Sequence, residues 1–145
     1  MIPILYESYE TEFTTNGIGR LRDVISFVVH EERNGVYEAD FEYPASGVYF
    51  DRIKLGMIVV AKHDDTDDAQ PFDIVSYSKP IDGVVLFHAV HISYRLSSMV
   101  ATGKDVNTIQ TAFERFKYAT PNMPFSFATD KISTGYVAAF DGIPK

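Results

Sequence analysis

The most regular alternation of apolar and polar positions along the chain lies in residues 36–43. Four apolar side chains alternate there with three acidic ones, namely Tyr37, Ala39, Phe41 and Tyr43 with Glu38, Asp40 and Glu42. Successive side chains of a strand point to opposite faces, and a period of two residues is therefore typical of a half-buried strand. The sequence predicts a strand whose outer face is acidic.

A β-hairpin is predicted over about residues 23–43. Residues 23–33 are rich in the β-branched residues that favour strands, which are Val24, Ile25, Val28 and Val29. Asn34-Gly35 lies between the two segments, and this pair suits the positive φ angles of a two-residue hairpin turn. We expect the two strands to pair across that turn.

Further strands follow at short intervals. After a loop with a short turn in residues 46–54, the apolar run 57–61 is expected to pair with residues 72–79. Residues 80–83 (Pro-Ile-Asp-Gly) then supply a turn before residues 84–92, which are apolar on both faces and are expected inside the sheet. Strands so closely spaced, without helices between them, predict an antiparallel β-barrel or sandwich.

Helical spacing replaces the β pattern near Gly103. Over residues 106–119 the apolar residues recur at helical intervals, at Val106, Ile109, Phe113 and Phe116. Asp105 or Asn107 can cap the start of this helix, because a side-chain oxygen there accepts a bond from a free backbone N–H. Thr120-Pro121 is expected to end it.

The last part of the chain offers two possible strands, at residues 125–129 and 136–140. The whole pattern predicts a mainly β protein with a smaller α+β part. We expect an antiparallel β-barrel domain over residues 1–100, followed over residues 101–145 by the beginning of a second α+β domain that is cut short.

Composition limits the classes of function. The chain has 145 residues, 46% of them hydrophobic, which is enough for about one ordinary globular core. Its net charge of −7 argues against stable binding of nucleic acid or of an anionic membrane. The absence of cysteine excludes disulfides and thiolate ligands. Residues 1–12 carry no cationic leader and no apolar run approaches a membrane span, and we therefore expect a soluble chain without an export signal.

Two groups of residues could hold a metal ion. His88 and His91 are three positions apart, but on a strand such positions face opposite sides, and a structural role is therefore the expectation. The acidic segment 63–68 could offer oxygen ligands to calcium through Asp64, Asp65, Asp67 and Asp68. It lacks the glycine and the distal glutamate of a calcium-binding loop, which favours a solvated hairpin loop.

No arrangement of residues typical of catalysis stands out. Glu31 with Glu32, or Glu38 with Asp40, could act as paired carboxylates, but such neighbours on a strand face apart or form a charged outer face. Residues 16–20 (Asn-Gly-Ile-Gly-Arg) lack the lysine and hydroxyl of a phosphate-binding loop and are expected to form a turn. We expect no catalytic residue, no metal ligand and no cofactor. The nine tyrosines leave open a carbohydrate-binding surface, for which Tyr43 and Tyr94 are candidates.

The order of several short segments resembles the N-terminal region of phage minor structural proteins, the prophage tail endopeptidase group. The segments are residues 1–6, 13–21, 31–38, 41–44, 53–56, 70–72, 78–80, 89–94 with Leu96, and 125–127. Each segment is short, but together they follow the order and spacing of that family along nearly the whole chain. The matching segments are structural ones and carry no catalytic residues.

The resemblance implies a structural component of a phage or prophage tail tip or baseplate hub. Such a protein would be made in the bacterial cytoplasm and located in the virion. As a homotrimeric ring in the full-length protein, it would join the tail tube or distal tail protein to the host-contacting tip. Any cell-wall hydrolase activity would belong to C-terminal regions outside this chain, and we expect no enzyme activity here. The alternative is a small carbohydrate-binding β-barrel module.

Overall fold

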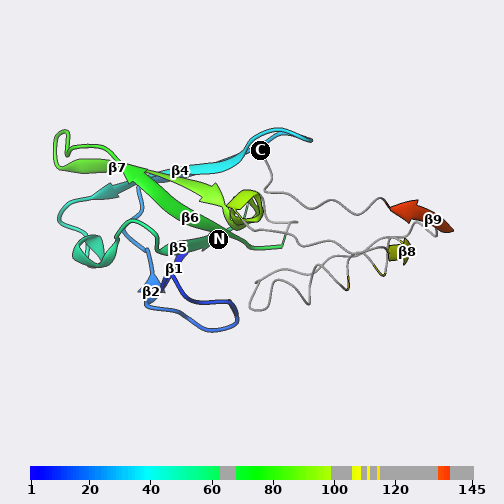
Figure 1. Cartoon of the computed structure of the whole chain (residues 1–145). Helices are drawn as coiled ribbons and strands as arrows, with labels where there is room; N and C mark the ends of the chain where they lie inside the picture. Colours follow the sequence, from blue (N-terminus) through cyan, green and yellow to red (C-terminus); the bar gives the residue numbers. More distant parts are fainter. Residues whose placement is uncertain (63–67, 99–105, 109–110, 112–113, 115–133, 138–145) are drawn as a thin grey trace. The chain divides into compact units, whose positions relative to one another are not determined.

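The computed structural model describes residues 1–62, 68–98, 106–108, 111, 114 and 134–137 (Figure 1). It divides into two compact units, Met1–Ile92 and Ser93–Lys145. The domain boundary expected between residues 100 and 101 falls outside the described residues.

The first unit is one seven-stranded antiparallel sheet. Its strands are β1 (Ile4–Tyr6), β2 (Gly19–Arg20), β3 (Ser26–Glu31), β4 (Tyr37–Pro44), β5 (Ile58–Ala61), β6 (Gln70–Tyr77) and β7 (Val84–His91). They follow one another in the order β2-β1-β5-β6-β7-β4-β3. Two 3₁₀-helices, η1 (Phe50–Arg52) and η2 (Ile92–Ser98), complete the named elements up to residue 98. The expected mainly β, antiparallel fold is confirmed.

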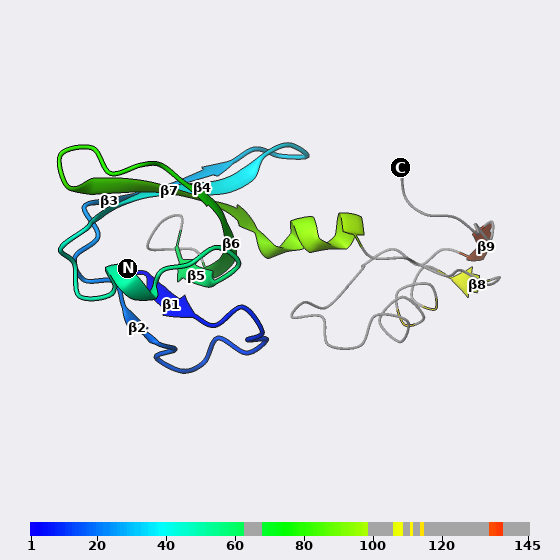
Figure 2. The same ribbon diagram turned by 60° about the vertical axis from the view of Figure 1, so that its left-hand side comes forward.

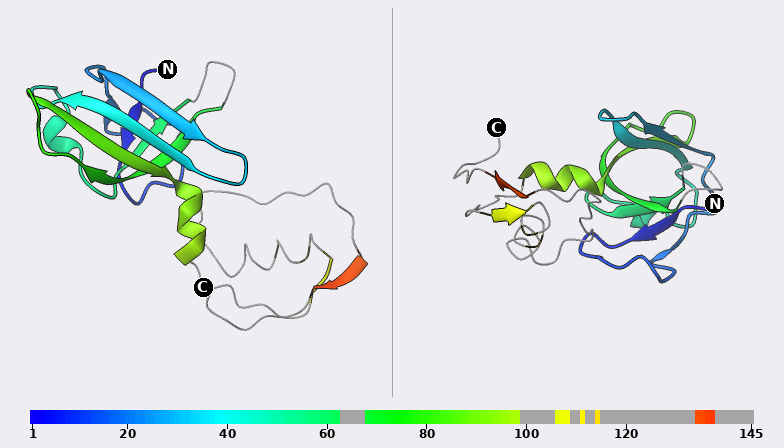
Figure 3. Two further views of the ribbon diagram at one scale, coloured as in Figure 1. Left: turned by 90° about the horizontal axis from the view of Figure 1, so that it is seen from above. Right: turned by 90° about the vertical axis from the view of Figure 1, so that its right-hand side faces the viewer.

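The sheet curls on itself into a half-barrel. In Figure 2, β3, β4 and β7 form one layer and β1, β2 and β5 the other, and β6 passes between them. A bulge in the β6–β7 pairing between Ile74 and Ser76 allows β6 to bend, because an extra residue strengthens the local twist of a strand. The right-hand view in Figure 3 looks along the curl and shows how the strands bend round. The two edge strands, β2 and β3, are joined by residues 21–25 alone, which keeps the edges of the sheet close together.

The strand predicted from the alternation in residues 36–43 is present as β4. Ala39, Phe41 and Tyr43 are fully buried in the main core, and the acidic residues between them lie on the other, half-buried face of β4. The buried core also takes residues from β1, β5, β6 and β7, and partly buried residues of β3 pack against it. The buried residues include Leu5, Val59, Phe72, Ile74, Val85, Phe87 and Ala89. β7 pairs with both β6 and β4 and is therefore an interior strand, as expected.

The first hairpin forms, but its turn differs from the expectation. β3 begins at Ser26 rather than at residue 23, and its pairing with β4 ends at Glu31 opposite Tyr37. The connection therefore spans residues 32–36 instead of two residues. Glu32 N–H donates to the Val36 carbonyl and Gly35 N–H to the Glu32 carbonyl, and these two bonds close the longer loop. Only Asn34 takes a positive φ, of 60°, whereas a two-residue turn of the expected kind needs two such residues in succession.

The two-residue turn occurs instead in the β6–β7 hairpin. Asp82 and Gly83 have φ angles of 50° and 76°, and Ile81 and Val84 exchange two backbone hydrogen bonds of 2.9 Å across them. Two consecutive positive φ angles match the twist of the flanking strands, which is why Asp-Gly favours this turn. The turn predicted at residues 80–83 is confirmed.

Replacing Gly83 with alanine is expected to lower the free energy of unfolding by about 1 kcal/mol, because a Cβ is unfavourable at this positive φ. No atom lies within 4 Å of the position that the Cβ would take, and the loss therefore reports backbone strain alone. Urea unfolding measures it. Gly83→Asn is the matched control, because asparagine tolerates this conformation, and equal stability of the alanine and glycine chains would contradict the prediction.

The pattern analysis missed the two N-terminal strands. β1 lies between β2 and β5, and all three of its residues are buried. Leu5 joins the main core, while Ile4 and Tyr6 pack with Ile58 and Val60 in a second, smaller cluster. The Phe13 ring covers this cluster edge-on to Tyr6, with ring centroids 5.2 Å apart. A strand of three residues that is buried on both faces shows no alternation.

In the second unit, β8 (Val106–Thr108) pairs antiparallel with β9 (Thr134–Val137). The helix predicted over residues 106–119 was therefore wrong at its start, and Asn107 lies in a strand instead of capping a helix. Thr111 and Glu114 are helical, whereas Asp105 and the strand predicted at residues 125–129 lie outside the described residues. β9 overlaps the strand predicted at residues 136–140 only at positions 136–137. No helix in the described ranges is long and apolar enough to cross a membrane.

Candidate functional site

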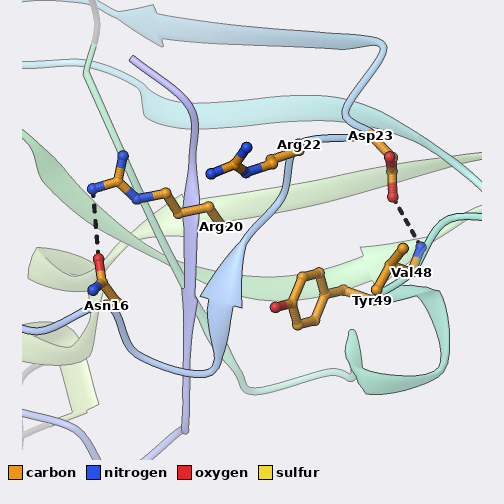
Figure 4. Close-up of a pocket in the computed structure, with 6 residues that line it drawn as sticks. All are labelled: Asn16, Arg20, Arg22, Asp23, Val48 and Tyr49. Atoms are coloured by element: carbon orange, nitrogen blue, oxygen red, sulfur yellow. Dashed lines mark hydrogen bonds between the residues drawn. The ribbon is translucent and has the colours of Figure 1, made fainter.

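A polar hollow of the first unit lies beside β2. It is lined by Asn16, Arg20, Arg22, Asp23, Val48 and Tyr49 and has a volume of about 530 Å³ (Figure 4). All of these residues except Tyr49 are exposed, and the hollow is therefore a groove open to solvent. We refer to it as the arginine groove.

One wall of the groove is set by a buried leucine between two arginines. Leu21 is fully buried, and its N–H donates to the Pro3 carbonyl at 2.8 Å. The chain then turns tightly, because Arg22 N–H donates to the Arg20 carbonyl at 2.9 Å and Val24 N–H to the Leu21 carbonyl at 3.2 Å. Leu21 belongs to the main core. The side chains of Arg20 and Arg22 extend in the same direction (Figure 4).

The opposite wall is held by a hydrogen-bonded network around Tyr43. The Asp23 carboxylate accepts bonds from the Val48 N–H at 2.9 Å and from the Tyr43 hydroxyl at 3.2 Å. The same hydroxyl accepts a bond from the Tyr49 N–H at 3.2 Å. Burial raises the pKa of Tyr43, the nearby Asp23 carboxylate raises it further, and the bond from Tyr49 opposes the shift. The phenol therefore stays neutral and joins the start of β3 to the loop after β4.

Tyr49 closes the groove by packing against a glycine. A Cβ at Gly19 would lie 2.1 Å from the Tyr49 hydroxyl oxygen, and only a residue without a side chain leaves room for this ring. Gly17 has a positive φ of 54°, as in a turn, but Gly19 and Arg20 form β2, and the turn expected over residues 16–20 was therefore wrong for its last two positions. The same segment continues into β2 and supplies Asn16 and Arg20 to the groove.

The two guanidinium groups have little to neutralise them. Arg20 makes one long hydrogen bond, 3.5 Å from its Nη2 to the Asn16 side-chain oxygen. The Arg22 side chain makes no hydrogen bond or ion pair with any residue in the described part of the chain. Asp23, the one acid of the groove, is bonded to Val48 and Tyr43 instead. Two adjacent cations thus face solvent in a chain whose net charge is −7.

A second polar cluster lies on the outer face of β3, β4 and β7. His88 Nδ1 lies 2.8 Å from one Asp40 oxygen, and His30 Nε2 lies 3.6 Å from the other. His88 Nε2 is 3.7 Å from Glu38, and imidazoles and carboxylates therefore alternate across three strands. Such cross-strand pairs stabilise a sheet by some tenths of a kcal/mol each. Within the described ranges, no group of three or more histidine and acidic residues is arranged to hold a metal ion.

His91 lies on the opposite face of β7 from His88. Its ring stacks on Tyr37 with centroids 4.3 Å apart, lies edge-on to the buried Phe72, and contacts the Gln70 side-chain oxygen at 3.3 Å. The two histidines therefore face opposite sides of the strand, as their spacing predicts. Burial lowers the pKa of His91, and the Asp73 carboxylate opposes this shift.

The depressed pKa of His91 predicts a pH dependence of stability. The unfolded chain, with an ordinary pKa near 6.5, takes up a proton before the folded chain does. The contribution of neutral His91 is thus fully present above about pH 6.5 and is lost as pH falls through the lower folded pKa. Urea unfolding at pH 7.5 and 5.5 should show a smaller loss on acidification for His91→Gln than for the native chain. His88→Gln is the matched control. If His91→Gln loses as much stability on acidification as the native chain, the prediction is contradicted.

Other residues considered in the sequence do not join the groove. Of the acidic segment 63–68 only Asp68 is described, and it is exposed. Glu31 and Glu32 are exposed, Glu31 as the last residue of β3 paired with β4 and Glu32 just beyond it. Tyr43 was wrong as a carbohydrate-stacking candidate, because its ring is fully buried, whereas Tyr94 in the second unit is 39% exposed. The sequence analysis did not identify Arg22, Asp23, Val48 and Tyr49 as residues of a site. The one signal in the sequence was an apolar residue, Leu21, between two arginines.

No family model, no curated protein and no solved structure matches this chain.

Proposed function

We propose that the chain is a structural component of a phage or prophage tail tip or baseplate hub. In this role it joins the tail tube or distal tail protein to the host-contacting tip, and the full-length protein forms a homotrimer in the virion. The ordered series of segments resembling phage minor structural proteins supports the proposal, since it includes β1, β2, the β3–β4 loop, the start of β6 and the end of β7.

The open edge of the sheet is the structural observation that carries the proposal. β3 is an edge strand of six residues, and in the described part of the chain only β4 pairs with it. Val28 lies in this strand and is 48% exposed, and Ile25, just before the strand, is 55% exposed. An unpaired edge strand with exposed apolar residues is suited to pairing with a neighbouring subunit, and lateral pairing of this kind builds rings.

The acidic outer face of β4 suits a ring around a DNA passage. Glu38, Asp40 and Glu42 lie on one face, and a negatively charged passage would repel DNA instead of binding it. This orientation is part of the proposal. A ring structure with these three residues on its outer surface would contradict it.

Light scattering of the chain, alone and mixed with a tail-tube or distal tail protein, tests the proposed role. We expect a trimer or a complex formed with one of these partners. Val28→Lys, which places a charge on the β3 edge, should weaken that assembly, because lysine on an edge strand prevents strand pairing. Ile81→Lys changes a 71% exposed residue in the β6–β7 turn, which belongs neither to the β3 edge nor to the arginine groove, and serves as the control. A chain that stays monomeric with both partners would contradict the proposal.

A cell-wall digestion assay distinguishes this role from an enzymatic one. We expect no cleavage of purified cell wall by this chain, and measurable cleavage would favour an enzyme. The carbohydrate-binding alternative loses Tyr43 as a stacking surface, because that ring is buried. Glycan binding that disappears in Tyr94→Ala would revive it.

A further inference from the structure

The arginine groove has the charge of a site for an acidic ligand. Arg20 and Arg22 both line the groove, and their side chains extend in the same direction (Figure 4). Apart from Asn16, no described side chain bonds to either guanidinium. Two neighbouring cations repel each other, and carboxylates placed between them relieve that repulsion. Guanidinium groups also present paired N–H donors that match the two oxygens of a carboxylate.

The groove is held in shape before any ligand arrives. Asp23, Tyr43 and Tyr49 are linked by hydrogen bonds of 3.2 Å, and Asp23 also accepts the Val48 N–H at 2.9 Å. Buried Leu21 anchors the arginine side of the groove. A site with fixed walls loses less entropy on binding than a flexible one.

An apolar residue and an aromatic ring lie beside the two cations. Val48 is 81% exposed, the largest exposed fraction among the described large hydrophobic residues, and the Tyr49 ring is half-buried next to it. Arginine and tyrosine are among the residues that most often dominate binding energy at protein interfaces. This combination favours a protein segment, with an apolar side chain between acidic ones, over a bare inorganic anion.

We propose that the arginine groove binds an acidic segment of a partner protein, with its carboxylates on Arg20 and Arg22 and an apolar side chain on Val48 and Tyr49. The interaction is independent of the tail role proposed above, because it requires only this groove and such a segment. Because the groove is open, binding is expected to weaken at high salt.

Nuclear magnetic resonance titration with short blocked peptides tests the site. Acetyl-Glu-Leu-Glu-amide should shift the Tyr49 amide and the Arg22 side-chain signals in a saturable way, and acetyl-Gln-Leu-Gln-amide should not. The double variant Arg20→Gln, Arg22→Gln should bind the acidic peptide at least about tenfold more weakly, the loss expected for charge-assisted bonds. Arg52→Gln removes an exposed arginine that does not line the groove and should bind as the native chain does.

Three results would overturn the inference. The first is the absence of any saturable shift with the acidic peptide. The second is equal binding by the glutamine peptide or by the double arginine variant, whose unfolding midpoint confirms that it is folded. The third is inorganic phosphate shifting the same signals as strongly as the acidic peptide, which would indicate a small-anion site. None of these results depends on whether the chain assembles with tail proteins.

Discussion

Replacing Phe41 with alanine is expected to lower the free energy of unfolding by about 3–5 kcal/mol, the usual range for a buried phenylalanine. Phe41 is fully buried at the centre of an aromatic row that crosses three strands. Its ring stacks on Phe27 of β3 with centroids 5.5 Å apart and on Phe87 of β7 with centroids 4.9 Å apart. The change therefore opens a cavity in the core and removes two ring contacts at once.

Urea unfolding with matched variants isolates the contribution of this row. Phe41→Leu keeps most of the buried volume and should cost clearly less than the alanine variant. Val28→Ala, on the exposed face of the neighbouring strand, should change stability by no more than about 0.5 kcal/mol. A loss below about 1.5 kcal/mol for Phe41→Ala would show that the row does not hold the curled sheet together.

The strands that carry this row were predictable from the sequence because their signal is local. Alternation at Ala39, Phe41 and Tyr43 needs only the pleat of a strand and one apolar side of the sheet. Asp82-Gly83 marks a two-residue turn, since few other pairs tolerate two successive positive φ angles. These two signals were enough to predict an antiparallel β fold.

Features that depend on tertiary contacts could not be predicted from the sequence. β1 is three residues long and becomes a strand only because β2 and β5 pair with it on either side. At Val106 the apolar spacing suits a helix, but pairing with Val137 makes it part of a strand. Tertiary pairing overrides weak local preference over so few residues.

The arginine groove could not be predicted from the sequence for the same reason. Its walls meet through Asp23 and Val48, which are 25 positions apart, and through Gly19, whose missing side chain admits Tyr49. No spacing rule connects these positions. Only the arginines on either side of Leu21 were visible as a local pattern.

Removing the Tyr43 hydroxyl is expected to lower the free energy of unfolding by about 1–3 kcal/mol, because its hydrogen-bond partners lose a bond inside the fold. In Tyr43→Phe the Tyr49 N–H loses its acceptor, and Asp23 retains only the bond from Val48. Tyr77→Phe is the matched control, since Tyr77 is 59% exposed, and should change stability by less than about 0.5 kcal/mol. Urea unfolding at pH 7 measures both variants.

The raised pKa of Tyr43 gives the same hydroxyl a second, independent readout. The unfolded phenol ionises near pH 10, while the folded one resists ionisation because it is buried beside Asp23. Its contribution to stability is therefore fully present below about pH 10 and is lost as pH rises through the higher folded pKa. Between pH 9 and 11 the native chain should lose more stability than Tyr43→Phe does. Equal losses, together with an unchanged Tyr49 amide signal in the variant, would mean that the hydroxyl does not hold the wall of the groove.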